Sequence, residues 1–389
     1  MTRFRVALDA RRLSGQKRGV GQYVYELARH LPSQAPDMEF LLLVDRHLDA
    51  GSIPDGCREV VVGHPYGKPI KKFRDVGARA HSILWMNVLL PLALRREAVD
   101  VFHGTNYALP VWTKCRTVVT IHDLIALRVP GAFEPAYQRY AQSLIPRVAS
   151  QADHIVAVSH ATKRDITELL DVRPDDVSVV YHGVGGEFLG PFEQNYLSEV
   201  KARLVLPKRF VLYVGAIERR KRLDTLLEAC AGLLRKGLID AVVLAGEDHY
   251  RAKDVDRTAI KLGIEASVLR VGYVEQRLLP GLYTLAEVVS LASDYEGFGM
   301  PIVEAMACGT PVVTSDISSL PEIAGNAATL VPPGDEHALA CAIESLVVDA
   351  DLRRRMIALG RVRAASFRWA DTAARHVDVY RRVLAGDRS

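Results

Sequence analysis

Two consecutive arrays of short apolar runs, separated by amphipathic stretches, limit what this chain can fold into more than any other feature. Several runs are almost continuously apolar, which is typical of parallel strands buried on both faces. The first array predicts strands at residues 4–8, 39–44, 58–62, 100–103, 117–122, 154–159 and 177–181. The second predicts strands at residues 210–214, 241–245, 268–271, 288–291, 311–314 and 328–331. This alternation predicts an α/β fold with doubly wound parallel sheets.

A glycine-rich segment at residues 182–192 (HGVGGEFLGPF) interrupts the alternation. Gly and Pro at this density break regular structure, so we place a domain boundary there. A chain of 389 residues is also long for one hydrophobic core. We therefore predict two Rossmann-like domains, residues 1–185 and 186–369. Ligands should bind at the carboxyl ends of their strands.

Composition excludes several classes of protein. A net charge of +4 is too small to indicate nucleic-acid binding by itself. The five cysteines show neither zinc-ligand nor redox spacing, which favours a reducing compartment. The N-terminus lacks the pattern of a signal peptide, and the most apolar segment, residues 83–94, is too short to span a bilayer. We expect a cytoplasmic protein.

The strongest candidate site is the string EGFGMPIVEAMACGTPVV, which begins at Glu296. Gly299 lets the backbone approach a ligand, and Pro301 suits the first turn of a helix. The N–H groups of residues 300–302 would then suit an anionic phosphate. Glu296 and Glu304 are placed to bind hydroxyls at two points along one ligand.

A second candidate is the basic string YVGAIERRKRL, which follows the first strand of the second array. Its four consecutive cations, residues 219–222, would neutralise a diphosphate and stabilise the charge on a departing nucleoside diphosphate. The alternative is a solvated basic helix start, which the helix dipole opposes.

Two weaker signals lie in the first array. His122 ends a strand, where it would point toward a ligand, although many histidines there are only structural. The string GVGQY, which contains Gly21, follows a basic loop with Arg11, Arg12, Lys17 and Arg18 and suits phosphate at a helix start. A tight turn is the alternative interpretation.

The sequence holds no full GxGxxG, P-loop, HExxH or GxSxG string, which disfavours an NAD oxidoreductase. Its two Asp-x-Asp strings, Asp254/Asp256 and Asp349/Asp351, lie in polar stretches away from strand ends. Residues two apart on a helix do not share a face. We predict no metal site, with the cations taking the role of a metal.

Together these segments resemble glycosyltransferase family 4, the large family of retaining glycosyltransferases of the GT-B fold, over almost the whole chain. The resemblance implies two Rossmann-like domains with an interdomain cleft. The family's Glu-x7-Glu signature is matched by Glu296 and Glu304, which implies contacts with the donor sugar and the ribose, respectively. Arg220 and Lys221 match the diphosphate-binding pair, and His122 matches a histidine near the donor sugar.

The resemblance extends to the remaining site residues and to the end of the chain. Arg219 and Arg222 stand where the family usually has Pro and Asn. A helix at about residues 370–389 is similar to one that packs back on the first domain. The implied catalytic residues are His122, Glu296, Arg220 and Lys221; the implied donor-binding residues are Gly21, Gly215, Tyr273, Val274, Phe298, Gly299, Met300, Pro301, Ile302 and Glu304.

The implied activity is retaining hexosyl transfer that needs no cofactor beyond the nucleotide-sugar co-substrate and no metal. The opening LDARRL, GVGQY and FHGTNYALP at residues 102–110 resemble a mannosyltransferase-like branch, which favours GDP-mannose. Other GDP-, TDP- or UDP-linked sugars stay open. A lipid-linked saccharide or polysaccharide is the expected acceptor.

A basic stretch supports a lipid-linked acceptor. It lies beside the apolar residues 83–94 and suits peripheral contact with an anionic membrane, at the inner face of the cell membrane. An ordinary loop followed by a core helix is the alternative. The basic residues are Lys68, Lys71, Lys72, Arg74 and Arg79.

Two rival interpretations remain. Another GT-B enzyme, such as a nucleotide-sugar epimerase or a phosphorylase, would use a similar site. A non-catalytic sugar-binding protein would need export, and it would leave the pair Arg220 and Lys221 without a purpose.

Overall fold

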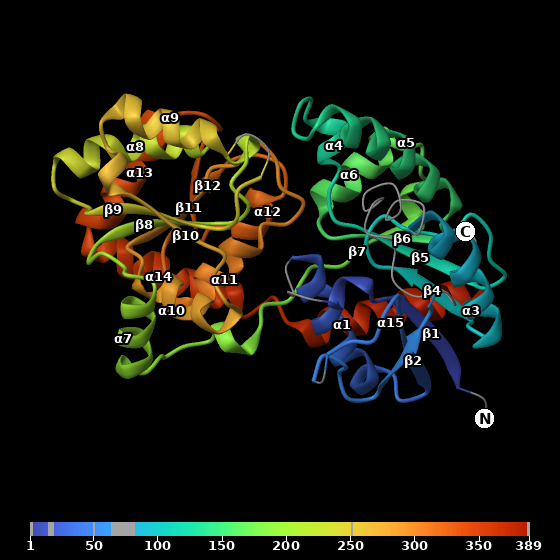
Figure 1. Cartoon of the computed structure of the whole chain (residues 1–389). Coiled ribbons are helices and arrows are strands. Elements are labelled where there is room, and N and C mark those ends of the chain that lie inside the picture. Colours follow the sequence, from blue (N-terminus) through green and yellow to red (C-terminus); the bar gives the residue numbers. More distant parts are fainter. Residues whose placement is uncertain (1–2, 15–18, 50, 64–81, 250–251, 387–389) are drawn as a thin grey trace, which may run out of the picture. The chain divides into compact units, whose positions relative to one another are not determined.

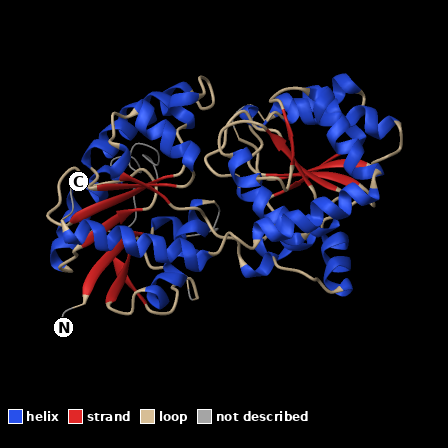
Figure 2. Ribbon diagram, turned by 180° about the vertical axis from the view of Figure 1, so that it is seen from behind, coloured by secondary structure: helices blue, strands red, loops and turns tan. Residues whose placement is uncertain are grey.

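The computed structural model describes residues 3–14, 19–49, 51–63, 82–249 and 252–386, and the chain divides into two compact units. Unit 1 comprises Met1–Leu124, Arg139–Gly183 and Trp369–Ser389, and unit 2 comprises Ile125–Gln138 and Val184–Arg368. In each unit, helices cover both faces of a parallel sheet (Figures 1 and 2). The predicted α/β class with two Rossmann-like domains is confirmed.

The sheet of unit 1 has the strand order β3-β2-β1-β4-β5-β6-β7, and all of its pairings are parallel. The order reverses beside β1, where an open α/β sheet binds its ligands at the carboxyl ends of the strands. The strands are β1 (Phe4–Asp9), β2 (Met38–Val44), β3 (Cys57–Val61), β4 (Val101–Gly104), β5 (Arg116–Ile121), β6 (His154–Ala157) and β7 (Val177–Val179).

The sheet of unit 2 has the order β10-β9-β8-β11-β12-β13 and is also parallel. Here β8 and β11 are neighbours, so the loops that follow them leave the same edge of the sheet. All strands predicted from the apolar runs form in both units. The strands of unit 2 are β8 (Phe210–Val214), β9 (Ala241–Ala245), β10 (Val268–Gly272), β11 (Val288–Leu291), β12 (Val312–Ser315) and β13 (Thr329–Val331).

In unit 1, the last helix of the chain packs along the first. Helices α1 (Val20–Gln34) and α15 (Trp369–Ala385) share a core in which Leu27, Val377 and Tyr380 are almost fully buried. Helix α6 (His160–Leu169) is capped by Ser159, whose side chain accepts a hydrogen bond from the Thr162 amide. The other helices are η1 (Arg11–Leu13), η3 (Trp85–Leu89), α3 (Leu90–Arg96), α5 (Pro135–Gln151), of which residues 135–138 belong to unit 2, and η4 (Pro174–Asp176).

In unit 2, helices α8, α9 and α13 lie on one face of the sheet, and α10, α11 and α14 lie on the other (Figure 1). The short helix α4 (Ile125–Arg128) groups with this unit because Ile125 and Ala132 share an apolar cluster with Tyr295. The helices are α7 (Gln194–Arg203), α8 (Leu223–Arg235), α9 (Lys253–Leu262), α10 (Leu279–Leu285), α11 (Met300–Cys308), α12 (Leu320–Ala324), α13 (Glu336–Val348) and α14 (Ala350–Ala364).

Parts of two predicted basic segments lie outside the described residues. These are Lys17 and Arg18 of the first loop, and Lys68, Lys71, Lys72, Arg74 and Arg79. Within the described ranges, none of the helices combines the length and the apolar character needed to cross a membrane.

Candidate active site

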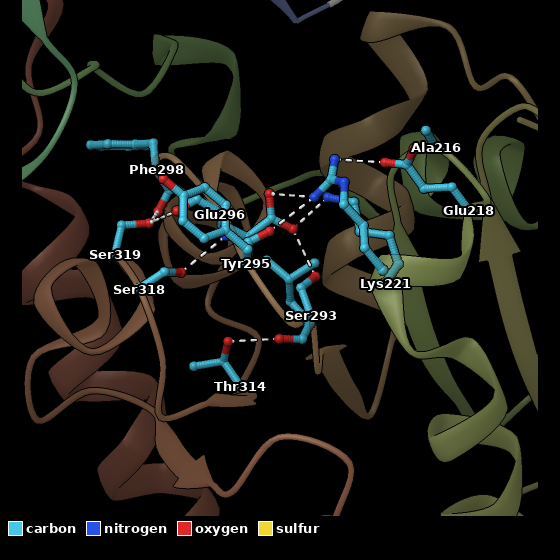
Figure 3. Close-up of polar contacts among 12 residues, drawn as sticks. Ala216, Glu218, Lys221, Ser293, Tyr295, Glu296, Phe298, Thr314, Ser318 and Ser319 are labelled. Atoms are coloured by element: carbon cyan, nitrogen blue, oxygen red, sulfur yellow. Dashed lines mark hydrogen bonds and ion pairs between the residues drawn. The ribbon is translucent and has the colours of Figure 1, made fainter. Parts of the chain in front are cut away.

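The loops after β8 and β11 bring opposite charges together at the carboxyl edge of the unit 2 sheet. The first loop carries Glu218, Arg220 and Lys221, and the second carries Glu296. We call these four residues the charged cluster. Figure 3 shows the side chains of Glu296 and Lys221 close together, with Glu218 farther from Glu296. The sequence identified the cations and Glu296 separately, and the pairing of β8 with β11 places them in contact.

The charged cluster is held by several ion pairs and hydrogen bonds. Arg220 Nη2 lies 2.6 Å from Glu218 Oε1, and Arg220 Nη1 lies 3.5 Å from Glu296 Oε2. Arg220 Nη1 also donates to the Tyr295 carbonyl at 2.9 Å. Lys221 Nζ donates to Glu296 Oε1 (Figure 3). Two cations are thus matched by two carboxylates.

Burial and charge act against each other within the cluster. The four side chains are between 7% and 12% exposed. Burial alone would raise the pKa of Glu296, but the charges of Lys221 and Arg220 outweigh it and lower this pKa to about 2. Burial, followed by repulsion from Arg220, lowers the pKa of Lys221. Glu296 is therefore ionised at neutral pH and competes with any ligand anion for the two cations.

Three serines fix the loop that carries Glu296, and sequence reasoning missed them. Ser293 Oγ donates to Glu296 Oε1 at 2.7 Å, and the Glu296 amide donates to Ser318 Oγ at 3.0 Å. Ser319 Oγ donates to the Glu296 carbonyl at 2.9 Å (Figure 3). Ser293 lies two positions after the end of β11 and was detectable as a polar residue near a strand end. Ser318 and Ser319 follow β12, and only the strand order brings them here.

The four consecutive cations do not act as one group. Arg219–Lys221 form the short 3-10 helix η6, in which successive side chains diverge by about 120°. Arg220 and Lys221 therefore enter the charged cluster, while Arg219 is exposed. Arg222 instead pairs with Asp294 at 2.7 Å. Of the four cations that the sequence groups together, two therefore lie in the charged cluster.

The start of α11 offers fewer backbone donors than the sequence indicated. Gly299 precedes the helix with φ of +101°, a conformation that favours glycine. Pro301 has no N–H, and the Ile302 amide donates to the Gly299 carbonyl at 3.0 Å. The Met300 amide is therefore the donor that this turn presents to an anion. Gly215, at the end of β8, also has positive φ, at +147°.

Several predicted donor-binding side chains differ in their exposure. Phe298 and Ile302 are buried, and Phe298 packs edge-on against Phe367 at 5.7 Å between ring centroids. Both residues can therefore meet a ligand mainly through their backbone. Tyr273, after β10, is 37% exposed, whereas the neighbouring Val274 is buried.

The second glutamate of the signature has a different environment from the first. Glu304 lies on α11, and Tyr283 Oη donates to its Oε2 at 2.7 Å. Burial raises the pKa of Glu304, the Tyr283 hydrogen bond opposes this shift, and the nearby Glu187 carboxylate adds to it, so that the pKa rises to about 7 in total. The two glutamates therefore differ in charge state near neutral pH. Tyr283 was not predicted, because nothing local in the sequence links it to Glu304.

The remaining predicted residues belong to unit 1. His122 follows β5, and its Nε2 lies 2.9 Å from the Thr105 carbonyl. A carbonyl only accepts, so Nε2 carries the proton, and burial lowers the pKa of this histidine so that it is neutral. Its ring packs against the Tyr23 ring, with centroids 4.9 Å apart. Gly21 lies in the first turn of α1.

A buried polar chain surrounds Tyr23. The His376 Nδ1–H donates to the Thr372 carbonyl, so its neutral ring accepts the Tyr23 hydroxyl at Nε2, at 2.9 Å. The direction of each further bond is then fixed, because each hydroxyl has one proton. We call this the histidine–tyrosine chain; it runs from Tyr380 through His103, Thr120, Tyr23 and His376 to Thr372.

The aspartates of the two Asp-x-Asp strings have structural partners. Asp254 pairs with Arg257 at 2.9 Å, and Asp256 pairs with Arg270 at 3.0 Å. Asp349 caps α14, and Asp351 pairs with Arg354. Within the described part of the chain, no group of three His, Cys, Asp or Glu side chains is arranged to hold a metal ion. Metal independence stays a prediction.

Family models match the two halves of the chain in turn. Residues 17–186 match the model described as Glycosyltransferase Family 4, and residues 198–363 match the model described as Glycosyl transferases group 1.

Curated relatives match over different lengths. The chain is 29% identical to the O-antigen chain mannosyltransferase B of Escherichia coli, over 74% of this chain and 76% of that protein. It is 30% identical to a D-inositol 3-phosphate glycosyltransferase of Kineococcus radiotolerans, over 95% and 92% of the two chains. A match to the serotype-specific mannosyltransferase WbdA of Escherichia coli, at 28% identity, covers 72% of this chain but 36% of that longer protein.

Solved structures share the fold at low sequence identity. The sucrose-phosphate synthase of Thermosynechococcus elongatus superimposes with a TM-score of 0.77 at 22% identity, over 99% and 100% of the two chains. Anabaena HepE in complex with UDP and glucose superimposes with a TM-score of 0.72 at 19% identity, over 97% and 99%. With the family matches and the full-length relative, these findings establish that the chain belongs to glycosyltransferase family 4, as a glycosyltransferase of the GT-B fold.

Proposed function

We propose that this glycosyltransferase moves a hexose, mannose being favoured, from a nucleotide sugar to a lipid-linked saccharide or polysaccharide, with retention and without a metal ion. The main support for this proposal is the charged cluster, in which Arg220 and Lys221 lie beside Glu296 at the carboxyl edge of the unit 2 sheet. Similarity to a mannosyltransferase supports mannose and hence GDP-mannose. Anabaena HepE, which was solved with UDP and glucose, supports a nucleotide-sugar donor in general.

The charged cluster suggests how a donor binds. In the free protein the two cations are paired with Glu218 and Glu296. An incoming diphosphate replaces part of this pairing, because it offers more negative charge to Arg220 and Lys221 than one carboxylate does. Glu296 is then released to accept hydrogen bonds from the sugar hydroxyls, held in place by Ser293.

The chemical step follows from these contacts. The bond between the anomeric carbon and the diphosphate oxygen breaks, and its electron pair leaves with the diphosphate. Arg220 and Lys221 stabilise this charge. The acceptor oxygen, which we assign to binding by unit 1, attacks from the same face, and its proton moves to the leaving phosphate oxygen. This route needs neither a carboxylate nucleophile nor a metal.

The test is a transfer assay with GDP-mannose and UDP-glucose as donors and lipid-linked saccharides as acceptors, with and without a chelator. We expect transfer from GDP-mannose, unchanged by the chelator, and a product with the anomeric configuration of the donor by NMR coupling constants. An inverted product, or loss of activity in chelator, contradicts the proposed mechanism. Interconversion of free nucleotide sugars without transfer would favour the epimerase interpretation.

A second acceptor class has its own support. The relative in Kineococcus radiotolerans matches almost the whole chain, and its name states D-inositol 3-phosphate. The same assay with inositol 3-phosphate as acceptor separates the two proposals. Transfer to inositol phosphate, with none to lipid-linked saccharides, would replace the favoured acceptor.

We propose that the enzyme reaches a lipid-linked acceptor at an anionic membrane surface. Ile83, Val88 and Leu92, around and within η3 and α3, are between 43% and 63% exposed. Trp112, which is 52% exposed, is tied to this surface by its Nε1–H bond to the Asn87 carbonyl. We expect blue-shifted Trp112 fluorescence with vesicles of anionic lipid, and none for Leu92→Glu. An unchanged spectrum argues against membrane contact.

A further inference from the structure

The carboxylate of Glu304 is held on one side and open on the other. Its Oε2 accepts the Tyr283 hydroxyl at 2.7 Å, while the residue as a whole is only partly buried. Among the described residues, Glu304 forms no ion pair with a lysine or an arginine. Its other oxygen is therefore available to neutral hydrogen-bond donors, and sugar hydroxyls are such donors.

Tyr283 is itself fixed in position by its surroundings. Its side chain is fully buried on α10, and its ring packs against Phe188 with centroids 6.1 Å apart. Thr310 Oγ1 donates to the Tyr283 carbonyl at 2.6 Å, which ties α10 to the segment after α11. A buried ring with a fixed backbone has little freedom, so its hydroxyl is a rigid donor.

We propose that Tyr283 is a positioning residue for the donor nucleoside, because its hydroxyl orients Glu304 so that the second carboxylate oxygen meets the ribose hydroxyls. This inference rests on the proposed function, in which Glu304 binds the ribose. A carboxylate that rotated freely would lose conformational entropy when the nucleoside bound. Tyr283 removes this entropic cost, because it fixes the carboxylate before binding. The ribose hydroxyls also compensate a carboxylate that has no cationic partner in the described part of the chain.

The experiment measures binding of GDP and of 2′,3′-dideoxy-GDP by calorimetry, with the corresponding UDP pair run in parallel. The proteins are the wild type, Tyr283→Phe, Glu304→Gln and Tyr196→Phe. Tyr196 is a matched control, because its hydroxyl also bonds within unit 2, to the Arg277 carbonyl and the Gly281 amide, and not to Glu304. The key quantity is the ratio of the two dissociation constants, which isolates the contribution of the ribose hydroxyls.

We expect Tyr283→Phe to weaken binding of the ribonucleotide about five- to tenfold, the scale of one well-placed hydrogen bond, and that of the dideoxy analogue less than about twofold. Tyr196→Phe should leave both affinities unchanged. Equal weakening of both nucleotides by Tyr283→Phe, or no weakening of either, overturns the inference.

Glu304→Gln separates the inference from the proposed function. If this variant abolishes the preference for ribose while Tyr283→Phe preserves it, only the role of Tyr283 fails. If Glu304→Gln keeps the wild-type preference, the ribose-binding role of Glu304 fails, and the inference fails with it.

A pH profile gives a second measurement that a merely structural role would not move. The ribose preference of the wild type should increase as the pH rises through about 7, because the ionised carboxylate accepts both hydroxyls. Tyr283→Phe removes the hydrogen bond that favours ionisation, so its profile should shift to higher pH. An unshifted profile in a folded variant contradicts the inference. If Tyr283→Phe does not fold, Glu304→Asp, which draws the carboxylate back from Tyr283, should lose the ribose preference; a retained preference overturns the inference.

Discussion

Buried polar groups are stabilised in opposite ways at the carboxyl edges of the two sheets. In unit 1, the histidine–tyrosine chain is neutral, and each proton in it has one acceptor. In unit 2, the charged cluster is built from full charges whose partners are other side chains. Because every hydrogen bond in the neutral chain is satisfied, its groups do not exchange partners with a ligand. The chain therefore acts as a rigid frame around His122. Ion pairs can be exchanged for a ligand anion, and so they suit a binding site.

The strongest test of this contrast removes charges from unit 2. Lys221→Ala and Glu296→Ala should each lower the transfer rate at least about 100-fold, the scale of one lost preorganised contact, with the fold intact. Arg219→Ala is the matched control, because Arg219 is exposed, and it should change the rate less than about twofold. Steady-state kinetics with circular dichroism measures both quantities. Near-native turnover in the two site variants would remove the charged cluster from the mechanism.

A second test separates the two signs of charge within the cluster. Lys221→Ala should weaken binding of a nucleoside diphosphate by at least about tenfold, because one of the two cations proposed to bind the phosphates is lost. Glu296→Gln should bind it as tightly as the wild type or more tightly, because the carboxylate no longer competes for Lys221. Calorimetry with GDP measures both effects. Weaker binding by Glu296→Gln would show that the ion pairs assemble the site rather than compete for it.

The neutral edge should respond to pH instead. Burial lowers the pKa of His376 to about 4, below its ordinary value of 6.5. The unfolded chain therefore binds a proton first, so stability is complete above about pH 6.5 and falls as the pH decreases toward 4. Trp85, Trp112 and Trp369 all lie in unit 1, so denaturation followed by tryptophan fluorescence reports on this unit. His376→Gln should flatten the slope; an equally steep slope would exclude His376 as its source.

Loss of one hydroxyl from the histidine–tyrosine chain should have a smaller effect than the changes described above. Tyr23→Phe leaves His376 Nε2 without its donor and should destabilise unit 1 by about 1–3 kcal/mol. Tyr140→Phe, at a 60% exposed position, should have no effect on urea denaturation. Equal stabilities of the two variants would mean that the chain contributes nothing to the frame.

The smallest effect is expected at Arg222, beside the charged cluster but outside it. Arg222 has φ of +49°, in the left-handed region that asparagine tolerates better. Arg222→Asn relieves this strain but loses the partly exposed pair with Asp294, so stability should change by less than about 1 kcal/mol. Urea denaturation measures it. A large loss of stability or transfer would place Arg222 in the working site.

The sequence alone determined the strands, and it predicted the glycine-rich boundary segment and the separate site motifs. These features are local: burial on both faces produces continuous apolar runs, and the string around Glu296 and Glu304 is contiguous. The sequence also identified Arg220 and Lys221, but it grouped them with Arg219 and Arg222. Side-chain direction within a 3-10 turn cannot be inferred from adjacency in the chain.

Only the tertiary structure decided which side chains meet. Lys221 and Glu296 are 75 positions apart, and Tyr23 and His376 are 353 apart; no local pattern links either pair. Their contacts depend on which strands become neighbours and on where α15 packs. The same holds for Tyr283, whose hydroxyl and burial distinguish Glu304 from Glu296, although both glutamates belong to one motif. The sequence gives the type of each side chain. The charge state of that side chain and its bonding partner depend on burial, which the whole fold creates.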